Sequence, residues 1–264
     1  MKIDGALAVV TGASGGIGAA IARSLHERGA GLVLTARRTP VLEELAASIS
    51  GARVEPCDLA DRQQVLDLGK RLSGADIVVA NAALPAAGRL ESFSPEEVER
   101  AVTVNLVAPM LLVHQVVPSM VARGRGHVVF ISSIGGKLAP PQLSVYAATK
   151  FGVRGFARSL RQDLAGTGVG VSVVSPGSIT DAGMLADAGL PAAPGTKGLS
   201  ARDVGDAVVE AIERNRAEID AAPAMVRFAA RVGALFPGLI EKASATKESR
   251  AYADALADGL RHLR

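Results

Sequence analysis

Short apolar runs alternate with helix-like stretches along most of this chain, and this alternation restricts the fold more than any other feature of the sequence. The apolar runs have the pattern of buried strands, at residues 6–10, 31–35, 53–57, 77–80, 127–132 and 170–175. Helical patterns separate them, at residues 17–28, 39–49, 62–72, 95–123, 145–167 and 201–216. Buried strands that alternate with helices predict an α/β fold, a doubly wound parallel sheet of about seven strands with helices on both faces.

The domain plan follows from the same alternation and from a composition that is 48% hydrophobic over 264 residues. We expect residues 1–264 to form a single Rossmann-like domain with a sizeable core. The alternation weakens after residue 176. Residues 178–200 are rich in Gly, Ala and Pro and predict either a substrate lid or plain irregular surface. Residues 221–264 predict a C-terminal helical extension.

Two apolar segments bear on membrane contact. Residues 223–242 are expected either to pack on the body or a sister subunit, or to form an exposed surface that contacts lipid peripherally or covers the pocket. Residues 102–122 lack acids, Lys and Arg and approach the roughly 20 residues that a bilayer requires. Because they include Asn105, His114, Gln115 and two prolines, we expect a buried helix or a subunit contact, and no transmembrane segment.

Charge, cysteine and histidine content argue against several kinds of site. The net charge is only +3, and no Lys/Arg block carries interleaved aromatic residues, so we expect no nucleic-acid partner. The single cysteine, Cys57, indicates a reducing, cytoplasmic compartment, and we expect it to be a small buried thiol. The four histidines lack metal-ligand spacing, so we expect no metal site. The apolar run at 6–10 is too short for a signal peptide.

A glycine-rich loop, TGASGGIG at residues 11–18, connects the first expected strand to the first expected helix. Glycines permit positive φ and close backbone approach to a ligand, while the helix start behind them offers free N–H groups and a positive dipole end. At the first crossover of a doubly wound sheet, this arrangement predicts a dinucleotide-binding loop. The candidate contacts are Gly12, Ser14, Gly15, Gly16, Ile17 and Gly18.

Tyr146 and Lys150 are four residues apart in a helical stretch, and Ser133 lies thirteen residues before Tyr146. The four-residue spacing puts the phenol and the ammonium on one helix face. An adjacent ammonium favours the ionised phenol, so we expect the pKa of Tyr146 to lie below its usual value of about 10. Such a tyrosine transfers protons in catalysis. Taken alone, the same spacing also describes a surface tyrosine beside a solvated lysine.

The loop spacing TGxxxGxG, followed in order by Ser133, Tyr146 and Lys150, resembles the short-chain dehydrogenase/reductase family over about residues 4–215. The resemblance implies that Tyr146 is the general acid in carbonyl reduction and the base in alcohol oxidation. It implies that Lys150 lowers the pKa of Tyr146 and binds the nicotinamide ribose, and that Ser133 hydrogen-bonds the substrate oxygen. Ser132 is the competing serine, and we expect it to face the other side of the sheet.

Two asparagine positions match the family's motifs as well. By resemblance, Asn105 bends its helix and holds a water that links Lys150 to solvent, although an asparagine also kinks or caps helices on its own account. Asn81 and Ala82 follow the fourth expected strand, where the family usually has Asn-Ala-Gly, and the resemblance implies that they stabilise the sheet and line the cofactor cleft. Ala83 replaces the usual glycine, which makes backbone contacts there less certain.

The segment after the sixth expected strand matches the family only in part. Pro176 and Gly177 correspond to its Pro-Gly pair, where the backbone approaches the nicotinamide, and Ile179 fits the apolar position that meets the carboxamide. Asp181 stands where the family often has Thr, and Thr180 is the nearest substitute. Contacts beyond Ile179 are therefore left open.

The nucleotide end of the site indicates NADP as the cofactor. The position that carries Asp in NAD-preferring members is Ala36, and Arg37 and Arg38 follow it. Guanidinium groups grip a phosphate with paired hydrogen bonds, which suits the 2′-phosphate of NADP. The alternative is two solvated arginines. By resemblance, Asp58, with Leu59 beside it, binds the adenine end, although an aspartate there also suits a helix start.

Together these expectations describe an NADP(H)-dependent oxidoreductase that interconverts a carbonyl and a primary or secondary alcohol. Pocket walls are expected at 85–88, 135–143 and 178–200, and their small apolar residues favour a small to medium hydrophobic substrate. Two alternatives retain the nucleotide: a catalytically silent regulator or redox sensor, and an epimerase or dehydratase. The resemblance also implies a homodimer or homotetramer.

Overall fold

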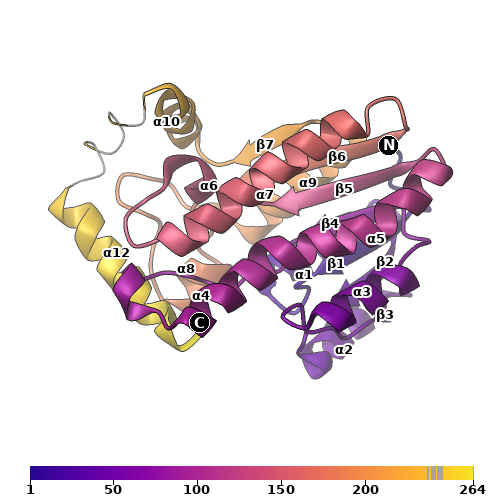
Figure 1. The fold of residues 1–264 in the computed structure, drawn as a ribbon, viewed down its shortest axis with the longest axis horizontal. Coiled ribbons are helices and arrows are strands. Elements are labelled where there is room, and N and C mark those ends of the chain that lie inside the picture. Colours follow the sequence, from indigo (N-terminus) through magenta and orange to yellow (C-terminus); the bar gives the residue numbers. More distant parts are fainter. Residues whose placement is uncertain (237, 239–241, 243–245, 264) are drawn as a thin grey trace.

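A parallel β-sheet forms the centre of the computed structural model, which describes residues 1–236, 238, 242 and 246–263. Within those residues seven strands lie in the order β3-β2-β1-β4-β5-β6-β7, and all neighbouring strands are parallel (Figure 1). The strands are β1 (Leu7–Thr11), β2 (Gly31–Thr35), β3 (Arg53–Val54), β4 (Ile77–Ala80), β5 (Gly126–Ile131), β6 (Val169–Pro176) and β7 (Glu218–Ala221). The winding direction reverses between β1 and β4, and in such sheets the crevice beyond the carboxyl ends of those strands binds ligands.

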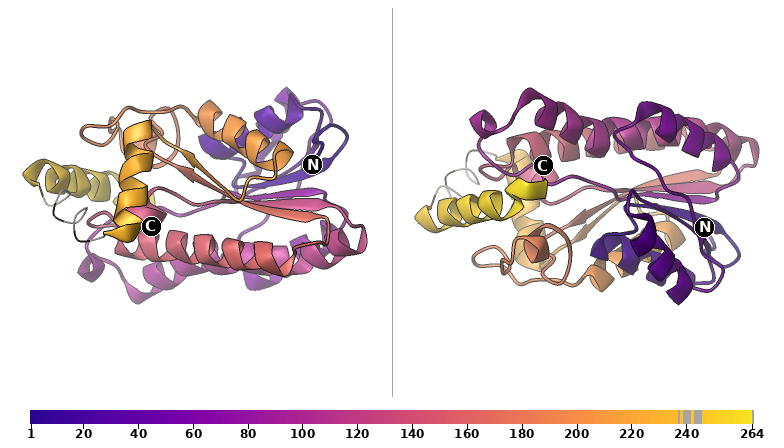
Figure 2. Two further views of the ribbon diagram at one scale, coloured as in Figure 1. Left: turned by 90° about the horizontal axis from the view of Figure 1, so that it is seen from above. Right: turned by 90° about the horizontal axis from the view of Figure 1, so that it is seen from below.

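Helices cover both faces of the sheet (Figure 2). One layer holds α1 (Gly16–His26), α2 (Thr39–Ser48) and α9 (Ala201–Glu213), and the other holds α3 (Arg62–Arg71), α5 (Ala108–Ala122) and α7 (Ser144–Asp163). The π-helical segment η2 (Thr103–Val107) joins α4 (Pro95–Val102) to α5. The remaining elements are η1 (Leu90–Ser92), α6 (Gly135–Leu138), α8 (Gly183–Asp187), α10 (Ala224–Leu235), α12 (Lys247–Leu260) and η3 (Arg261–Leu263). The predicted doubly wound α/β fold is confirmed.

Two apolar cores lie on the two faces of the sheet. Successive strand residues point to opposite faces, so Val9 packs with the α3–α5–α7 layer and Val10 with the α1–α2–α9 layer. Burial on both faces explains why the strands read as continuous apolar runs. Aromatic residues make up only 3% of the chain, and a contact between the rings of Phe130 and Phe156, with centroids 5.7 Å apart, joins β5 to α7.

The expected third and seventh strands differ from what the structure contains. The predicted strand at 53–57 is regular only over Arg53–Val54, although the N–H groups of Glu55 and Cys57 still donate to Leu34 O and Ala36 O of the β2 segment. Pro56 between them has no N–H to give. Cys57 is buried, as expected, and burial raises the pKa of its thiol to about 11. β7 falls in a polar stretch in which the sequence marked no strand.

Among the described residues, 95–122 form the one helical stretch that is long and apolar enough to cross a membrane by length and composition. Helices buried within a folded domain pass the same test. Here Leu112, Val113, Val116 and Met120 of α5 are buried against the sheet and α3. The buried helix expected at 102–122 is confirmed.

The C-terminal part of the chain returns to the edge of the sheet where the strands end (Figure 1). Leu256 and Leu260 of α12 pack against Met184 and Leu190 of the 178–200 segment. α10 packs through Ala230 on the region of α6. Of the apolar segment expected at 223–242, residues 237, 239–241 lie outside the described part of the chain.

Candidate active site

A cavity of about 1160 Å³ opens beyond the carboxyl ends of β1, β4, β5 and β6. All but one of the residues proposed from the sequence for catalysis or cofactor binding line it: Gly12, Ser14, Gly15, Gly16, Ile17, Gly18, Arg37, Arg38, Asp58, Leu59, Asn81, Ala82, Ser133, Tyr146, Lys150, Pro176, Gly177 and Ile179. Asn105 is the exception and lies behind the cavity wall. Residues far apart in sequence meet here because parallel strands end at the same edge of the sheet.

Four glycines of the glycine-rich loop, Gly12, Gly15, Gly16 and Gly18, line the cavity, so much of this wall is bare backbone. Gly12 has a positive φ of 67°, and Gly15 N donates to Gly12 O at 3.1 Å, which closes a tight turn. A Cβ on Gly18 would lie against Gly12 O and 2.8 Å from Asn81 Nδ2, so the helix approaches the loop as closely as a glycine allows. α1 begins at Gly16 without a side-chain cap or an acidic residue in its first turn. Its free N–H groups suit a pyrophosphate.

Thr11 and Asn81 fasten the ends of β1 and β4 on either side of the crevice. The N–H groups of Asn81 and Ala82 both donate to Thr11 Oγ1, at 3.0 and 3.1 Å, and Asn81 Nδ2 donates to Thr11 O at 2.9 Å. Asn81 thus lies where the resemblance put it, between the sheet and the cavity. The Ala83 position also lines the cavity.

Arg37 and Arg38 lie exposed at the rim beyond β2. Arg38 Nη2 donates to Ser14 O at 2.7 Å, which brings its guanidinium over the glycine-rich loop. Within the described residues, no carboxylate lies within ion-pair distance of either arginine. Both guanidinium groups therefore present positive charge that no described carboxylate compensates at this rim of the crevice, and such groups suit a phosphate.

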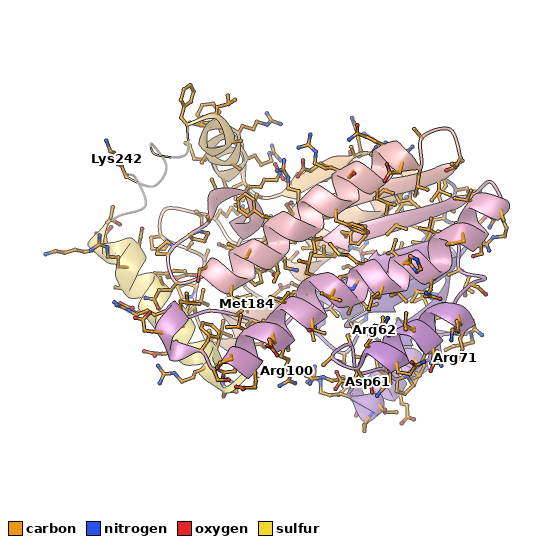
Figure 3. All side chains as sticks on the ribbon, in the orientation of Figure 1. Asp61, Arg62, Arg71, Arg100, Met184 and Lys242 are labelled. Carbon is orange, nitrogen blue, oxygen red and sulfur yellow. The ribbon has the colours of Figure 1, made fainter. Side chains whose placement is uncertain are left out.

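Asp58 does not start the helix that follows it. Asp61 occupies the N-cap of α3 and accepts hydrogen bonds from Gln63 N and Gln64 N, at 2.8 and 3.1 Å (Figure 3 labels Asp61). Asp58 Oδ1 instead accepts from Ala60 N at 3.0 Å while the residue lines the cavity. Its alternative assignment as a helix cap is therefore wrong, and its carboxylate lies at the nucleotide end of the crevice.

Ser133 and Tyr146 bring two hydroxyls together at the inner end of the cavity. Tyr146 lies on α7 and is buried, with its hydroxyl close enough to the Ser133 hydroxyl to influence its pKa. Gly135 N donates to Ser133 Oγ at 3.0 Å and holds the serine in the turn before α6. Lys150, one helical turn further on, is also buried, and its Nζ lies 5.6 Å from the centre of the Tyr146 ring.

The pKa of Tyr146 differs from the sequence expectation. Burial raises it, and the hydrogen bond from Ser133 opposes that rise only in part. Lys150 Nζ donates to Ile131 O at 2.9 Å, and burial lowers the pKa of Lys150 to about 8. The expected depression of the Tyr146 pKa is therefore wrong for this structure, because loss of water around the phenol is the largest influence on that pKa. Tyr146 is held in its protonated form.

Ser132 faces α7, contrary to the expectation that it faces the other side of the sheet. Its hydroxyl is buried and donates to Lys150 O at 3.0 Å. This bond ties the end of β5 to the helix that carries the tyrosine. Ser133, rather than Ser132, remains the serine whose hydroxyl meets Tyr146, as the sequence analysis inferred.

Asn105 lies in the π-helical segment η2, where the long helix is irregular as expected. Its side-chain amide makes two hydrogen bonds to the backbone of Leu84: Oδ1 accepts from Leu84 N at 2.7 Å, and Nδ2 donates to Leu84 O at 3.0 Å. A longer contact of 3.4 Å joins Nδ2 to Thr149 Oγ1 on α7. Asn105 therefore positions both the Leu84 loop and the tyrosine helix. Its link to Lys150 through water stays a prediction.

The segment after β6 follows the family's pattern up to Ile179 and departs from it afterwards. Gly177 N donates to Ala221 O at 2.9 Å, and Ile179 is buried beside the cavity in a bridge with Leu199. Asp181 Oδ1 accepts from Ala201 N at 2.8 Å at the start of α9. Thr180 is exposed and packs over Gly198, away from the cavity, so it does not substitute for the family's threonine.

The C-terminal helices close the outer end of the cavity. Residues around α10 line it, in keeping with the interpretation that 223–242 covers the pocket, whereas a wall from α12 was not expected from the sequence. Besides residues of 135–143 and 178–200, the lining there includes Pro223, Met225, Val226 and Ala229 around α10, and Ser249, Tyr252, Ala253, Leu256, His262 and Leu263 at the C-terminus. The Tyr252 hydroxyl donates to Pro191 O at 2.8 Å, which fixes α12 to the 178–200 segment. The spacing of Ala253, Leu256, Ala257 and Leu260, at i, i+3, i+4 and i+7, was the available signal.

The described residues hold no group of three or more His, Cys, Asp or Glu side chains arranged to bind a metal ion. The titratable groups that do converge on the inner end of the cavity are Tyr146 and Lys150. The cavity therefore brings the phenol of Tyr146 and the amine of Lys150 together with the glycine-rich loop.

Comparison with known proteins links this geometry to one family. A family model described as short chain dehydrogenase matches residues 6–190. A glycine betaine reductase of Emericella nidulans is 39% identical over 228 residues, which are 80% of this chain but only 18% of that much longer protein. The ketoacyl reductase HetN of a Nostoc species is 33% identical over 226 residues, which are 82% of this chain and 78% of the relative.

Solved structures show the same likeness. A short-chain dehydrogenase from Sphingobium yanoikuyae, in complex with NADPH, superposes with a TM-score of 0.78 at 28% identity. The match covers 92% of this chain and 96% of that structure. The common architecture therefore extends beyond the residues that the family model matches and reaches into the C-terminal part of the chain.

Proposed function

This chain belongs to the short-chain dehydrogenase/reductase family of oxidoreductases, and we propose that it is an NADP(H)-dependent member that interconverts a carbonyl and an alcohol on a hydrophobic substrate. The observation that carries the proposal is that the Ser133 and Tyr146 hydroxyls lie close together in the cavity that also contains the glycine-rich loop and the uncapped N-terminus of α1. A tyrosine with only a packing role would not be expected beside a loop that suits a pyrophosphate.

Each polar group at the inner end has a role in carbonyl reduction. The product needs a hydride on carbon and a proton on oxygen, and bound NADPH supplies the hydride. Tyr146, held protonated by burial, donates the proton to the substrate oxygen. Ser133 donates a hydrogen bond to the same oxygen and stabilises the negative charge that grows there. The Lys150 ammonium, 5.6 Å from the Tyr146 ring centre, would stabilise the phenolate left behind and would bind the hydroxyls of a nicotinamide ribose.

The residues of the crevice fit a dinucleotide that carries an extra phosphate. The free N–H groups at the start of α1 would hold the pyrophosphate, and Asp58 with Leu59 would meet the adenine. Arg37 and Arg38, which lack a carboxylate partner in the described residues, would hold the 2′-phosphate. This fit favours NADP as the cofactor.

The cavity walls favour a hydrophobic substrate covered by a lid. We propose that 178–200 is that lid, since it supplies Met184, Leu185 and Ala193 to the wall and α12 packs on its outer side. Sequestration from water strengthens the hydrogen bonds to the reacting oxygen. We also propose a homodimer or homotetramer, because Val107 of η2, Val121 of α5 and Phe151 of α7 are exposed. We propose a cytoplasmic location because the single cysteine suits a reducing compartment.

Replacement of Tyr146 by phenylalanine tests the acid/base assignment. Tyr146→Phe should bind NADPH as the wild type does, while kcat on a panel of aldehydes, cyclic ketones and 3-oxoacyl thioesters falls by a factor of about 10² to 10⁴. Tyr252→Phe removes the hydroxyl of the other tyrosine, which bonds Pro191 O at the outer wall, and should lower kcat far less than Tyr146→Phe. Substantial turnover by Tyr146→Phe would contradict the assignment, and NADPH binding without turnover by the wild type would favour a regulator.

Cofactor preference is tested separately at the rim. The double variant Arg37→Ala/Arg38→Ala should raise the KM for NADPH at least tenfold, because charge-assisted bonds to a phosphate contribute roughly 1.5–3 kcal/mol each. The KM for NADH should change little, since NADH has no 2′-phosphate. Equal effects on both cofactors would refute the assignment of these arginines.

A further inference from the structure

The outer face of α10 carries an unusual concentration of exposed apolar side chains. Among the described residues, eight large hydrophobic side chains are exposed, and four of them lie between 225 and 236: Met225 (75%), Phe228 (64%), Leu235 (75%) and Phe236 (63%). Side chains of α10 extend away from the body of the molecule (Figure 3). Exposed apolar patches of this kind mark interaction surfaces.

The same helix forms part of the cavity wall with its other side. Val226 and Ala229 line the cavity, and Ala230 is buried against Ile134 and Ala222. Met225 belongs to both surfaces, since it lines the cavity and is also exposed. The exposed apolar face therefore borders the outer mouth of the cavity, at the end of the molecule formed by α10 and α12 (Figure 1).

Charge distinguishes this face from an ordinary protein contact. Arg227 and Arg231 are the charged residues of α10, which contains no acid. At about 100° per residue, Met225, Phe228 and Leu235 lie within roughly 80° of one another, and the two arginines flank them on one side. Neither arginine pairs with a carboxylate within the part of the chain that the structure describes, and an apolar stripe beside such cations is typical of helices that lie in the interface of an anionic bilayer.

We propose that α10 docks this protein on an anionic membrane surface, with Phe228, Leu235 and Phe236 entering the interface and the arginines contacting lipid phosphates. The cavity mouth would then open at the bilayer, from which a lipophilic substrate enters. That last consequence rests on the proposed function, whereas the docking itself does not. An anionic lipid surface matches the apolar stripe and the arginines of α10, and it requires no large contact area.

A second copy of the chain fits less well. A helix of 12 residues is about 18 Å long, so one face of it covers roughly 200 Å², against the roughly 800 Å² per partner of a stable interface. Packing α10 against its own copy would also bring the two arginine pairs together without an acid from either helix to balance them. Insertion of a few side chains into lipid requires no such area.

Vesicle sedimentation with the full-length protein tests the proposal. The wild type should sediment with vesicles of phosphatidylcholine and phosphatidylglycerol, and much less with phosphatidylcholine alone or in high salt. Phe228→Ser and Leu235→Ser should each weaken partitioning by about tenfold, because each removes an apolar side chain from the interface. Arg227→Gln/Arg231→Gln should weaken binding to anionic vesicles roughly fivefold for each arginine. Leu90→Ser is the matched control, a comparably exposed leucine on η1.

Three results would overturn the docking. The first is no sedimentation of the wild type with anionic vesicles. The second is an equal loss in Leu90→Ser and Leu235→Ser, which would mean that exposed apolar area in general, and not α10, drives the association. The third is a change of oligomeric mass in Phe228→Ser, measured by light scattering, with vesicle binding unaltered, which would assign the face to a second copy. None of these readouts depends on turnover, so a failure here and a failure of the proposed redox activity remain distinguishable.

Discussion

Protonation of one buried histidine should govern much of the acid sensitivity of this protein. His127 lies in β5 with only 1% of its surface exposed, and its Nε2 hydrogen-bonds to Ser172 Oγ on β6 at 2.8 Å. Burial, helped by the charges of the N-terminal amine and Arg161, lowers the pKa of His127 to about 3. In the unfolded chain the imidazole returns to its ordinary pKa of about 6.5.

The sign and size of the effect follow from this difference. Between pH 6.5 and about 3 the unfolded chain binds a proton at His127 and the folded chain does not, so stability falls as pH falls. At 1.36 kcal/mol per pH unit below the unfolded pKa, lowering the pH from about 8 to 4.5 costs about 2.7 kcal/mol. That is a large share of the 5–15 kcal/mol by which domains are typically stable. A folded pKa anywhere below 4 gives nearly the same loss at pH 4.5.

Urea unfolding of the wild type and of His127→Gln, at pH 7.0 and pH 4.5, isolates this contribution. Glutamine keeps a hydrogen-bonding group near Ser172 but does not titrate, so the variant should be less stable at pH 7.0 and should lose about 2.7 kcal/mol less than the wild type on acidification. Carboxylates titrate alike in both proteins and cancel in this comparison. His114→Gln, at an exposed position on α5, should match the wild type. Equal acid losses in the wild type and His127→Gln would refute the reasoning.

Two further predictions concern the crevice. Gly18→Ala should weaken NADPH binding at least tenfold in a fluorescence titration, because the added Cβ would press on Gly12 O and Asn81. Gly74→Ala is the control, since open space surrounds Gly74, and it should leave NADPH binding unchanged. Unchanged binding in Gly18→Ala would contradict the close approach of helix and loop. Asp61→Ala should lower the free energy of unfolding by about 1 kcal/mol through loss of the α3 cap. Asp58→Ala should instead lower NADPH affinity, and the reverse pattern would exchange the roles of the two aspartates.

The sequence predicted the strands that are buried on both faces, and it missed β7 for a physical reason. Residues 218–221 read EIDA, which looks too polar for a strand. Their charges are neutralised from elsewhere in the fold: Arg154 on α7 pairs with Glu218 at 2.6 Å, and Lys137 on α6 pairs with both Glu218 and Asp220. Local patterns cannot anticipate ion pairs between segments more than 60 residues apart.

The positions of site residues that directly follow parallel strands could be predicted from the sequence. The pKa of Tyr146 and the outer wall of the cavity could not, because they depend on tertiary packing. Sequence order alone was enough to bring Gly12, Asn81 and Ser133 to one edge of the sheet. The pKa of Tyr146 was misjudged because a four-residue spacing reports the neighbouring charge but not the loss of water around the phenol. The wall made by α12 was missed because it depends on how the chain end folds back over the 178–200 segment.

The π turn in η2 amounts to one surplus residue in an otherwise continuous helix. Deleting a single residue from 103–107 would let α4 and α5 fuse into an ordinary α-helix, while α5 kept its apolar side toward the sheet and α4 kept its own toward α7. The long helix would survive the deletion, but the amide of Asn105 would rotate away from Leu84 and leave that loop's N–H and C=O without their partner. The extra residue thus supports the loop at the crevice, at no benefit to the helix that contains it.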